Sequence, residues 1–199
     1  MIEFYNIDKA EPYSIFKTKY DLASKFGQSK IEAIAISSFN KTHDEVDSRF
    51  VNLKFIKGNE FIFFSNYNSP KSSAFSTHNQ IGALIYWSST DTQIRMKAKI
   101  KKTSISYNNS YFKKRSFNKN ALAISSSQSE IISSYNEVLR KYEGAKENND
   151  LSICPKYWGG FSFVPYYFEF WEGHKSRINK RIAFNNKEHN IWEKSILEP

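Results

Sequence analysis

Three side chains in the middle of the chain stand at a spacing suited to binding an anion. Tyr111 and Arg115 are four residues apart, so on a helix they lie one above the other. Lys119 falls four residues further on, provided that the helix continues through residues 116–117. Charged donors bind phosphate groups most strongly. From the residues alone, such a stripe could contact an anionic ligand or form an ordinary helix face turned to water, and the spacing does not decide between the two.

A second polar set lies near the C-terminus. Arg177, Asn179 and Arg181 follow a period of two, and a β-strand would point all three side chains to the same side. The segment before them is rich in aromatic residues. A polar face at the end of an aromatic strand is what a ligand site requires, and it also describes a face exposed to solvent. From the residues alone, both interpretations stay open.

The charge of the chain limits its partners. The 199 residues include 29 Lys and Arg against 20 Asp and Glu, a formal net charge of +9, which fits nucleic acid, a membrane surface or a small phosphorylated ligand. The basic residues are spread along the chain and match no nucleic-acid-binding motif, so we expect no nucleic acid partner. No apolar run approaches the roughly 20 residues that cross a bilayer, and the N-terminus lacks the pattern of a signal peptide. We expect a cytoplasmic protein that does not bind membranes.

Metal and thiol chemistry find little support in the sequence. The histidines, at positions 43, 78, 174 and 189, show no spacing typical of metal ligands. Ser, His and Asp residues form no recognisable nucleophile arrangement. The single cysteine, Cys154, excludes an intrachain disulfide, and we assign it no role. We expect no metal site.

The elements that must position these residues are typical of a mainly β protein with packed helices (α+β). A helix is expected over residues 11–26, and strands over 31–36, 49–56, 60–65, 81–87 and 92–102. Helices are expected next near 105–114, 118–125 and 133–142, followed by strands near 161–164, 168–171 and 177–184. This order favours one domain over residues 1–199, an antiparallel barrel with a helical N-terminal segment (1–28) and a helical insert (104–146).

The C-terminal third carries the most specific signal. It contains YWGGF at 157–161, FEFWEG at 168–173 and RINKR at 177–181. These segments resemble the signature of the pyridoxamine 5'-phosphate oxidase family, which reads approximately WGG, then EFW with a glycine two residues later, then RLHDR. The chain also ends in LEP, similar to the family's LAP. Further matches occur in the family's order over about residues 11–199.

The resemblance implies a fold, a cofactor and a reaction. The fold would be an antiparallel split β-barrel that binds flavin mononucleotide (FMN), with two flavin sites at the interface of a homodimer. Members oxidise pyridoxine or pyridoxamine 5'-phosphate to pyridoxal 5'-phosphate. Hydride passes to the flavin, and dioxygen then reoxidises the flavin and yields hydrogen peroxide. We expect an oxidoreductase of this kind, in which the protein supplies binding, orientation and electrostatics.

The resemblance also assigns residues to cofactor and substrate. Flavin contacts fall, by order in the chain, on Arg49, Phe64, Ser65, Lys71, Gln93, Gln128, Ser129, Trp171 and Arg181. The substrate phosphate is expected at Lys54, Tyr111, Arg115 and Lys119. Arg177 and Asn179 match the catalytic pair that flanks the substrate ring. The alternative at most of these positions is a solvated surface side chain or, for the tryptophan, a core aromatic.

Four positions depart from the family pattern. Pro70 stands where the family commonly has an arginine, and Lys119 replaces a serine. Asn179 replaces the histidine over the substrate ring, and Lys180 replaces an aspartate. Flavin positions are thus kept better than substrate positions. Two alternatives stay open: an FMN oxidoreductase acting on another, aromatic substrate, and a flavin-binding protein without turnover.

Overall fold

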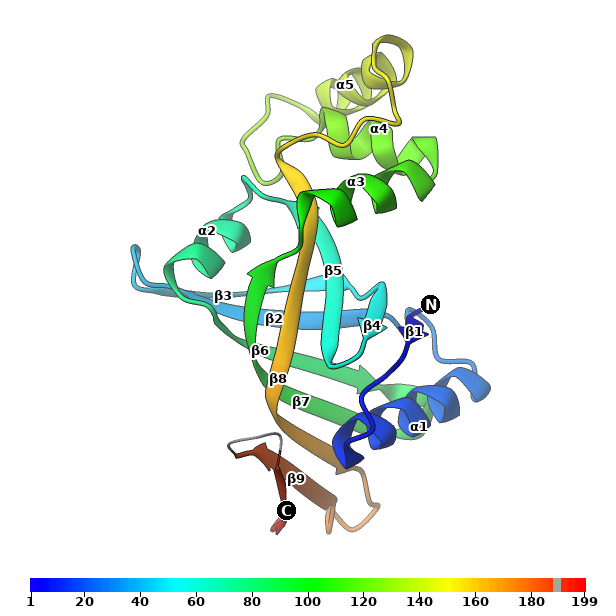
Figure 1. Ribbon diagram of the computed structural model, residues 1–199, viewed down its shortest axis with the longest axis vertical. Coiled ribbons are helices and arrows are strands. Elements are labelled where there is room, and N and C mark those ends of the chain that lie inside the picture. Colours follow the sequence, from blue (N-terminus) through cyan, green and yellow to red (C-terminus); the bar gives the residue numbers. More distant parts are fainter. Residues whose placement is uncertain (188–190) are drawn as a thin grey trace.

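The computed structural model describes residues 1–187 and 191–199. Within these residues, ten strands form one sheet and five α-helices accompany it (Figure 1). The strands are β1 (Glu3–Tyr5), β2 (Ala33–Asn40), β3 (Glu45–Asn52), β4 (Phe55–Lys57), β5 (Glu60–Asn66), β6 (Gln80–Trp87), β7 (Thr92–Lys102), β8 (Trp158–Glu172), β9 (Lys180–Asn186) and β10 (Trp192–Leu197). The helices are α1 (Glu11–Lys25), α2 (Pro70–Thr77), α3 (Ile105–Lys114), α4 (Phe117–Ser125) and α5 (Tyr135–Asn148).

Strand β8 is the centre of the sheet. It is 15 residues long and pairs with β5 near its start, with β7 along most of its length and with β9 near its end. The strand order is β1-β4-β5-β8-β7-β6-β2-β3, with β9 on β8 and β10 on β9. Among the described residues, β1 and β4 are the only strands that pair in parallel. No pairing among the described residues joins β1 to β3, so the expected barrel is confirmed only in part, as an open, mainly antiparallel sheet with helices.

One face of the sheet forms the core. Strand β7 alternates as expected, with Ile94 and Met96 buried and Arg95 and Lys97 exposed. Helix α1 packs on the buried face, where the ring of its Phe16 contacts the ring of Phe61 on β5, with 5.1 Å between the centroids. The expected helix over residues 11–26 is therefore confirmed to within one residue. None of the helices within the described residues is long and apolar enough to span a membrane.

Three of the expected strands are divided differently in the structure, and those expected over 31–36 and 177–184 are shifted toward the C-terminus, to 33–40 and 180–186. Residues 49–56 are divided between β3 and β4, because the chain changes partner there: the Leu53 N–H donates to the Glu32 carbonyl and the Lys54 N–H to the Ile62 carbonyl. The two strands expected within 161–171 form one strand, β8. Pro165 lies inside it, where the register with β7 shifts, and such a bulge is a place where a strand tolerates proline.

The helices expected near 105–114 and 118–125 are confirmed as separate elements, so the condition for a single helical stripe from Tyr111 through Arg115 to Lys119 is not met. Helix α3 ends at Lys114 and α4 begins at Phe117, with Arg115 and Ser116 in extended backbone between them. Serine is a preferred residue at the N-cap, which is the position of Ser116. Tyr111 therefore lies in α3, Arg115 directly after it and Lys119 in α4. In Figure 1, α3, α4 and α5 lie at one end of β8, and β9 lies at the other end.

Candidate functional site

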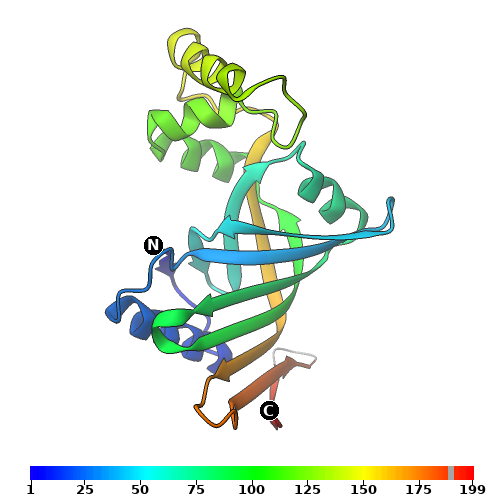
Figure 2. The same ribbon diagram turned by 180° about the vertical axis from the view of Figure 1, so that it is seen from behind.

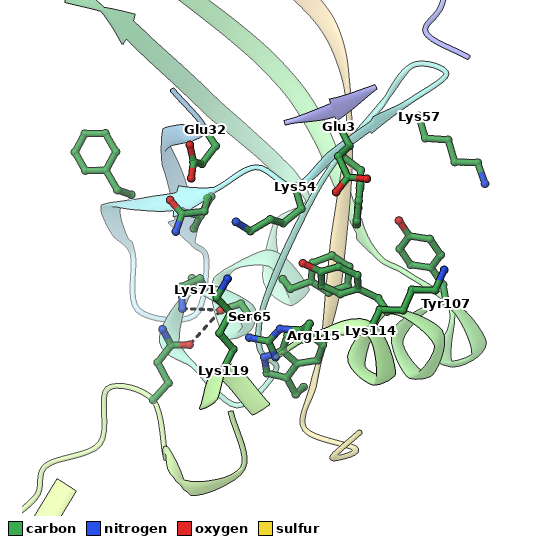
Figure 3. Close-up of a pocket in the computed structure, with 18 of the residues that line it drawn as sticks. Glu3, Glu32, Lys54, Lys57, Ser65, Lys71, Tyr107, Lys114, Arg115 and Lys119 are labelled. Atoms are coloured by element: carbon green, nitrogen blue, oxygen red, sulfur yellow. Dashed lines mark hydrogen bonds between the residues drawn. The ribbon is translucent and has the colours of Figure 1, made fainter. Parts of the chain in front are cut away.

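A large cavity lies among β3, β4, β5, α2, α3 and α4, with a volume of about 1390 Å³. It is lined by ten of the residues matched to ligands from the sequence: Arg49, Lys54, Phe64, Ser65, Lys71, Tyr111, Arg115, Lys119, Gln128 and Ser129. Figure 3 shows several of the basic side chains projecting into the same space. This cavity is the candidate functional site.

Lys71 is a buried cation at one end of the cavity. Its side chain is enclosed, with the residue only 7% exposed, and its Nζ donates to Ser65 Oγ (3.1 Å) and Ser69 Oγ (3.0 Å). It forms no ion pair with any described residue. Burial, with a smaller contribution from the charge of Arg49, lowers the pKa of Lys71 to about 8. The negative charge of Asp47 opposes this shift without outweighing it, so an anion bound here would supply a direct charge partner that Lys71 lacks among the described residues.

Helix α2 adds a second favourable feature for an anion at the same place. Ser69 is its N-cap residue and Pro70 its first helical residue. Proline suits this position because its φ is already helical and the helix does not need its N–H. The start of a helix also favours negative charge through its free N–H groups and its dipole. Pro70 thus removes a possible cationic side chain but helps to begin the helix that carries Lys71.

Arg49 supplies another cation that is already anchored. Its Nη1 donates to the Ile36 carbonyl (3.2 Å) and to Ser38 Oγ (2.7 Å), and its Nη2 pairs with Asp47. The hydrogen bond from Arg49 is the main cause of the lowered pKa of Asp47. Arg49 is therefore fixed in position with part of its charge balanced, whereas the charge of Lys71 is not.

The loop after α4 is attached to β5 at this end of the cavity. Ser65 Oγ donates to Gln128 Oε1 (3.1 Å), and Asn66 Nδ2 donates to the Ser126 carbonyl (3.1 Å). Ser129 has a φ of 73°, an uncommon value for a residue with a side chain. These contacts place Gln128 and Ser129 next to Ser65, in agreement with the grouping taken from the sequence.

Three more cations meet at another part of the cavity. Lys54 comes from the link between β3 and β4, Arg115 from the end of α3 and Lys119 from α4, and Figure 3 shows their side chains directed into the same space. Burial lowers the pKa of Lys54. The negative charge of Glu32 opposes this, and the positive charges of Lys119 and Arg115 lower the pKa further. A bound phosphate would relieve the repulsion among the three cations.

Arg115 is held by neutral partners that sequence reasoning did not assign. Its guanidinium lies 4.3 Å from the ring centroid of Trp158, and its Nη1 donates to Asn120 Oδ1 (3.2 Å). The Trp158 ring stacks on Phe64 at 5.2 Å, and Phe64 stacks on Tyr111 at 3.9 Å. Because neither partner of Arg115 is charged, its full positive charge stays available to a ligand. The WGG segment was the signal that could have indicated Trp158.

The two glycines after Trp158 allow its backbone to be clamped. Asn108 Oδ1 accepts a hydrogen bond from the Gly160 N–H (2.9 Å), and the Tyr67 hydroxyl donates to the Gly160 carbonyl (3.0 Å). A Cβ atom on Gly159 would lie 2.3 Å from Asn108 Nδ2 and from the Tyr67 hydroxyl. A glycine is therefore needed at 159 so that these two side chains can fix the start of β8.

Three of the residues matched to the flavin lie outside the cavity. Gln93 on β7 stands opposite Trp171 on β8, which stands opposite Arg181 on β9. Residues opposite one another on neighbouring strands place their side chains on the same face of a sheet. Here that is the face away from the core, because the neighbouring Ile94 and Phe170 are buried on the other side. We refer to Gln93, Trp171 and Arg181 as the β7–β9 cluster.

The β7–β9 cluster and the cavity lie at opposite ends of β8. Ser65 of the cavity pairs with Gly159 at the start of the strand, and Trp171 lies 12 residues beyond Gly159. At about 3.3 Å per residue the separation is roughly 40 Å. No small ligand bound to a single chain could contact both groups of residues.

Arg177 and Asn179 do not lie on a strand, contrary to the expectation. Both belong to the loop between β8 and β9, and only Arg181 of the three lies within β9. Arg177 has a φ of 61°, which is incompatible with a strand. The Asn179 side-chain oxygen accepts a hydrogen bond from the His174 N–H (3.0 Å). Asn179 therefore closes the loop, and Arg177 is left exposed.

The described residues contain no group of three His, Cys, Asp or Glu side chains that could hold a metal ion. His189 lies outside the described residues. Cys154 is half-buried, and burial raises the pKa of its thiol. Its Sγ donates to the backbone carbonyls of Pro155 and Trp158, and we assign it no role.

Comparison with known proteins places these features in a family. Residues 158–199 match the model of the pyridoxine 5'-phosphate oxidase C-terminal dimerisation region. The chain is 30% identical to a pyridoxine/pyridoxamine 5'-phosphate oxidase of Leptospira biflexa, over 95% of this chain and 89% of that protein. Its fold is similar to PhzG from Burkholderia lata in complex with tetrahydrophenazine-1-carboxylic acid (TM-score 0.87, 20% identity, 95% of this chain and 93% of that one). It is also similar to a pyridoxamine 5'-phosphate oxidase-related, FMN-binding protein of Nostoc punctiforme (TM-score 0.76, 11% identity, 96% and 99%).

The structure combines an open, mainly antiparallel sheet with a cavity lined by several cationic side chains. The 30% identity to the Leptospira biflexa protein extends over 95% of this chain, and this identifies the family. The chain belongs to the pyridoxine/pyridoxamine 5'-phosphate oxidase family.

Proposed function

We propose that the protein is an FMN-dependent oxidase that converts pyridoxine or pyridoxamine 5'-phosphate to pyridoxal 5'-phosphate. The observation that carries this proposal is a single cavity with two groups of cations, one centred on buried Lys71 and the other on Lys54, Arg115 and Lys119. In the family, the cofactor and the substrate each bear one phosphate. A cavity with places for two phosphates fits this pair of ligands.

The residues at the Lys71 end fit the phosphate of FMN. Lys71 is buried with hydroxyl partners only, and Arg49 and Ser65 lie beside it. Charge-assisted hydrogen bonds to phosphate are among the strongest that proteins make. When bound, FMN would accept hydride from the substrate and pass the electrons to dioxygen. The protein would hold both reactants in one cavity.

The working form is a homodimer with each flavin site at the interface. Gln93, Trp171 and Arg181 match flavin contacts but lie too far along β8 to reach the cavity of their own chain. Two-fold symmetry would bring this cluster of one chain to the cavity of the other, and the reverse. The match of residues 158–199 to a dimerisation region supports this arrangement.

An exposed apolar surface supports the same interface. Val46 and Phe50 on β3 and Tyr86 on β6 are 72%, 76% and 55% exposed. Figure 2 shows the molecule from behind, where no helix crosses in front of β3 or β6 and α2 lies beside one end of β2. Apolar side chains gathered on a sheet face are typical of a surface that another protein covers.

Substrate contacts would also come from both chains. Lys54, Arg115 and Lys119 would bind the phosphate within the cavity. Arg177 and Asn179 belong to the same end of β8 as Arg181, so in the dimer they would approach the substrate ring from the partner chain. Their exposed loop is consistent with a contact that forms only on assembly.

A second candidate function is oxidation of another aromatic substrate by the same flavin. Two observations favour it. Asn179 has no imidazole, and its oxygen already accepts the His174 N–H. Lys119 adds a charge to the phosphate pocket, and binding that is equal in ground and transition states does not raise kcat.

Reduction of the FMN-loaded protein without oxygen separates the two candidates. Pyridoxine and pyridoxamine 5'-phosphates should bleach the flavin absorption, whereas pyridoxamine without phosphate should not. Bleaching only by an aromatic carboxylic acid would favour the second candidate. If the protein fails to bind FMN at tens of micromolar, both candidates are wrong. Sedimentation with and without FMN tests the dimer, because a ligand that bridges two chains stabilises their association.

The departures from the family predict slow turnover of the phosphorylated substrate. Exchanging both residues, Lys119→Ser with Asn179→His, should raise kcat/KM about tenfold if the pair recovers roughly 1.4 kcal/mol of transition-state stabilisation. Lys113→Ser is the matched control, because Lys113 is an exposed lysine of α3 that does not line the cavity. Peroxide release and pyridoxal 5'-phosphate absorbance under air measure the effect. An unchanged kcat/KM would show that these two positions do not limit the reaction.

A further inference from the structure

A buried carboxylate lies beside the β7–β9 cluster, in contact with its Arg181. Glu169 on β8 is two residues before Trp171 and shares its face of the sheet, yet the residue is only 2% exposed. It is enclosed by the side chains of Arg95, Tyr167 and Arg181. A buried charge is costly unless it is paired and hydrogen-bonded. The four side chains therefore form one connected unit.

The two oxygens of Glu169 serve different partners. Oε1 accepts hydrogen bonds from Arg181 Nε (3.0 Å) and Nη2 (2.8 Å). Oε2 accepts from Arg95 Nη1 (3.1 Å) and from the Tyr167 hydroxyl (3.0 Å). Replacing Arg95 therefore leaves the bonds between Glu169 Oε1 and Arg181 in place. Replacing Arg181 likewise leaves the bonds to Glu169 Oε2 in place.

Arg181 is held on two sides and keeps free donors. Besides the bonds to Glu169, its Nη1 donates to the Glu198 carbonyl (2.7 Å). A guanidinium has five N–H donors, so one N–H on each terminal nitrogen is left over for a ligand. A side chain fixed before binding loses less conformational freedom when it meets its ligand. Glu169 and the chain near Glu198 both restrict the Arg181 side chain in this way.

We infer that Glu169 is a positioning residue, which holds Arg181 in the orientation that binds the cofactor of the neighbouring chain. The inference rests on the proposed function, because it takes Arg181 as a flavin ligand. Glu169 does not contact the cofactor. It acts through Arg181, and removing it should therefore have no effect on FMN binding once Arg181 has been removed.

A set of four proteins on an Arg95→Met background tests this. Loss of Glu169 in the wild type would leave two arginines facing each other, and Arg95→Met avoids that repulsion. The set comprises Arg95→Met alone, Arg95→Met with Glu169→Gln, Arg95→Met with Arg181→Gln, and the triple variant. FMN dissociation constants come from quenching of flavin fluorescence, and melting temperatures without FMN report on folding.

Arg95→Met alone should bind FMN within about twofold of wild type. Adding either Glu169→Gln or Arg181→Gln should weaken binding at least tenfold, and the triple variant should be no weaker than the one with Arg181→Gln, since coupled residues are not additive. The absorption spectrum of the bound flavin should change in the same pattern. If Glu169→Gln fails to fold, Glu169→Asp keeps the charge but shortens the reach, and it should also weaken FMN binding.

Two results would overturn the inference. One is an additive loss in the triple variant, or no loss with Glu169→Gln, because Glu169 would then support only the fold. The other is unchanged FMN binding with Arg181→Gln, because Arg181 would not be a ligand although the wild type binds FMN. Failure of the proposed function looks different: the wild-type protein itself would not bind FMN.

Discussion

Replacing Lys71 by methionine should stabilise the protein without FMN while weakening its binding of FMN. Burial is the main reason why the pKa of Lys71 falls from 10.5 to about 8. At 1.36 kcal/mol per pH unit, keeping this ammonium charged at pH 7 costs the native state about 3 kcal/mol. Methionine has a similar length and no charge. Loss of the hydrogen bonds to Ser65 and Ser69 offsets about 1 kcal/mol, which leaves a gain of about 2 kcal/mol.

The sign of this effect gives it a characteristic pH dependence. Between pH 8 and 10.5 the unfolded chain holds the proton of Lys71 and the native chain does not, so native stability rises with pH in that range. The advantage of Lys71→Met is therefore complete below about pH 8 and disappears near pH 10.5. With saturating FMN the variant should lose most or all of this advantage, because it lacks a charge-assisted bond worth about 1.5–3 kcal/mol.

Thermal unfolding and FMN titration measure both halves of the prediction. At pH 7 the melting temperature of the ligand-free variant should rise by roughly 4–8 °C, and its FMN dissociation constant should increase at least tenfold. Lys57→Met is the matched control, because Lys57 is an exposed lysine on the rim of the same cavity. It should change neither quantity. A ligand-free Lys71→Met protein that melts below the wild type would refute the reasoning, since burial of the charge would then cost the fold nothing.

Three further predictions follow from the site. The FMN dissociation constant of the wild type should rise about tenfold per pH unit above pH 8, because phosphate binding requires protonated Lys71; a flat profile by fluorescence titration would contradict this. Trp158→Leu removes the aromatic support of Arg115, worth about 0.5–2 kcal/mol. Steady-state kinetics should then show a KM for the phosphorylated substrate about 2–30 times higher, with kcat nearly unchanged. An equal loss with a substrate that lacks the phosphate would argue against this role. Gly159→Ala should lower the free energy of unfolding in urea by about 1–3 kcal/mol, because the new Cβ atom would overpack against Asn108. Gly144→Ala is the control: Gly144 lies in helix α5, a Cβ atom there would meet nothing within 4 Å, and the change should be neutral or stabilising.

Much of the fold followed from local patterns. Apolar and polar residues alternate along 92–102, a pattern that can be read from neighbouring residues alone, and β7 has the predicted bounds. The apolar spacing of residues 11–26 likewise defines α1. The short elements β1 and α2 were not predicted. Three strand residues are too few to show a period, and β1 exists because it pairs with β4 at the edge of the sheet.

The candidate site was predictable as a set of residues but not as an arrangement. The resemblance named ten residues that do line one cavity, because matches in order along the chain carry over to matching places in a shared fold. It did not separate the β7–β9 cluster from that cavity, since the separation depends on the length of β8. It also did not assign Trp158, Asn120 or Glu169, whose roles depend on contacts between distant segments.

The position of the two groups of residues at opposite ends of β8 has a consequence for mixtures of defective chains. In the proposed dimer, a chain impaired at Lys71 and a chain impaired at Arg181 are each inactive with a partner of their own kind. A mixed dimer combines both impairments in one site and leaves the other site with an unaltered Lys71 and an unaltered Arg181. Two inactive variants that are unfolded and refolded together should therefore regain flavin binding. In a cell that makes both, each variant would complement the other.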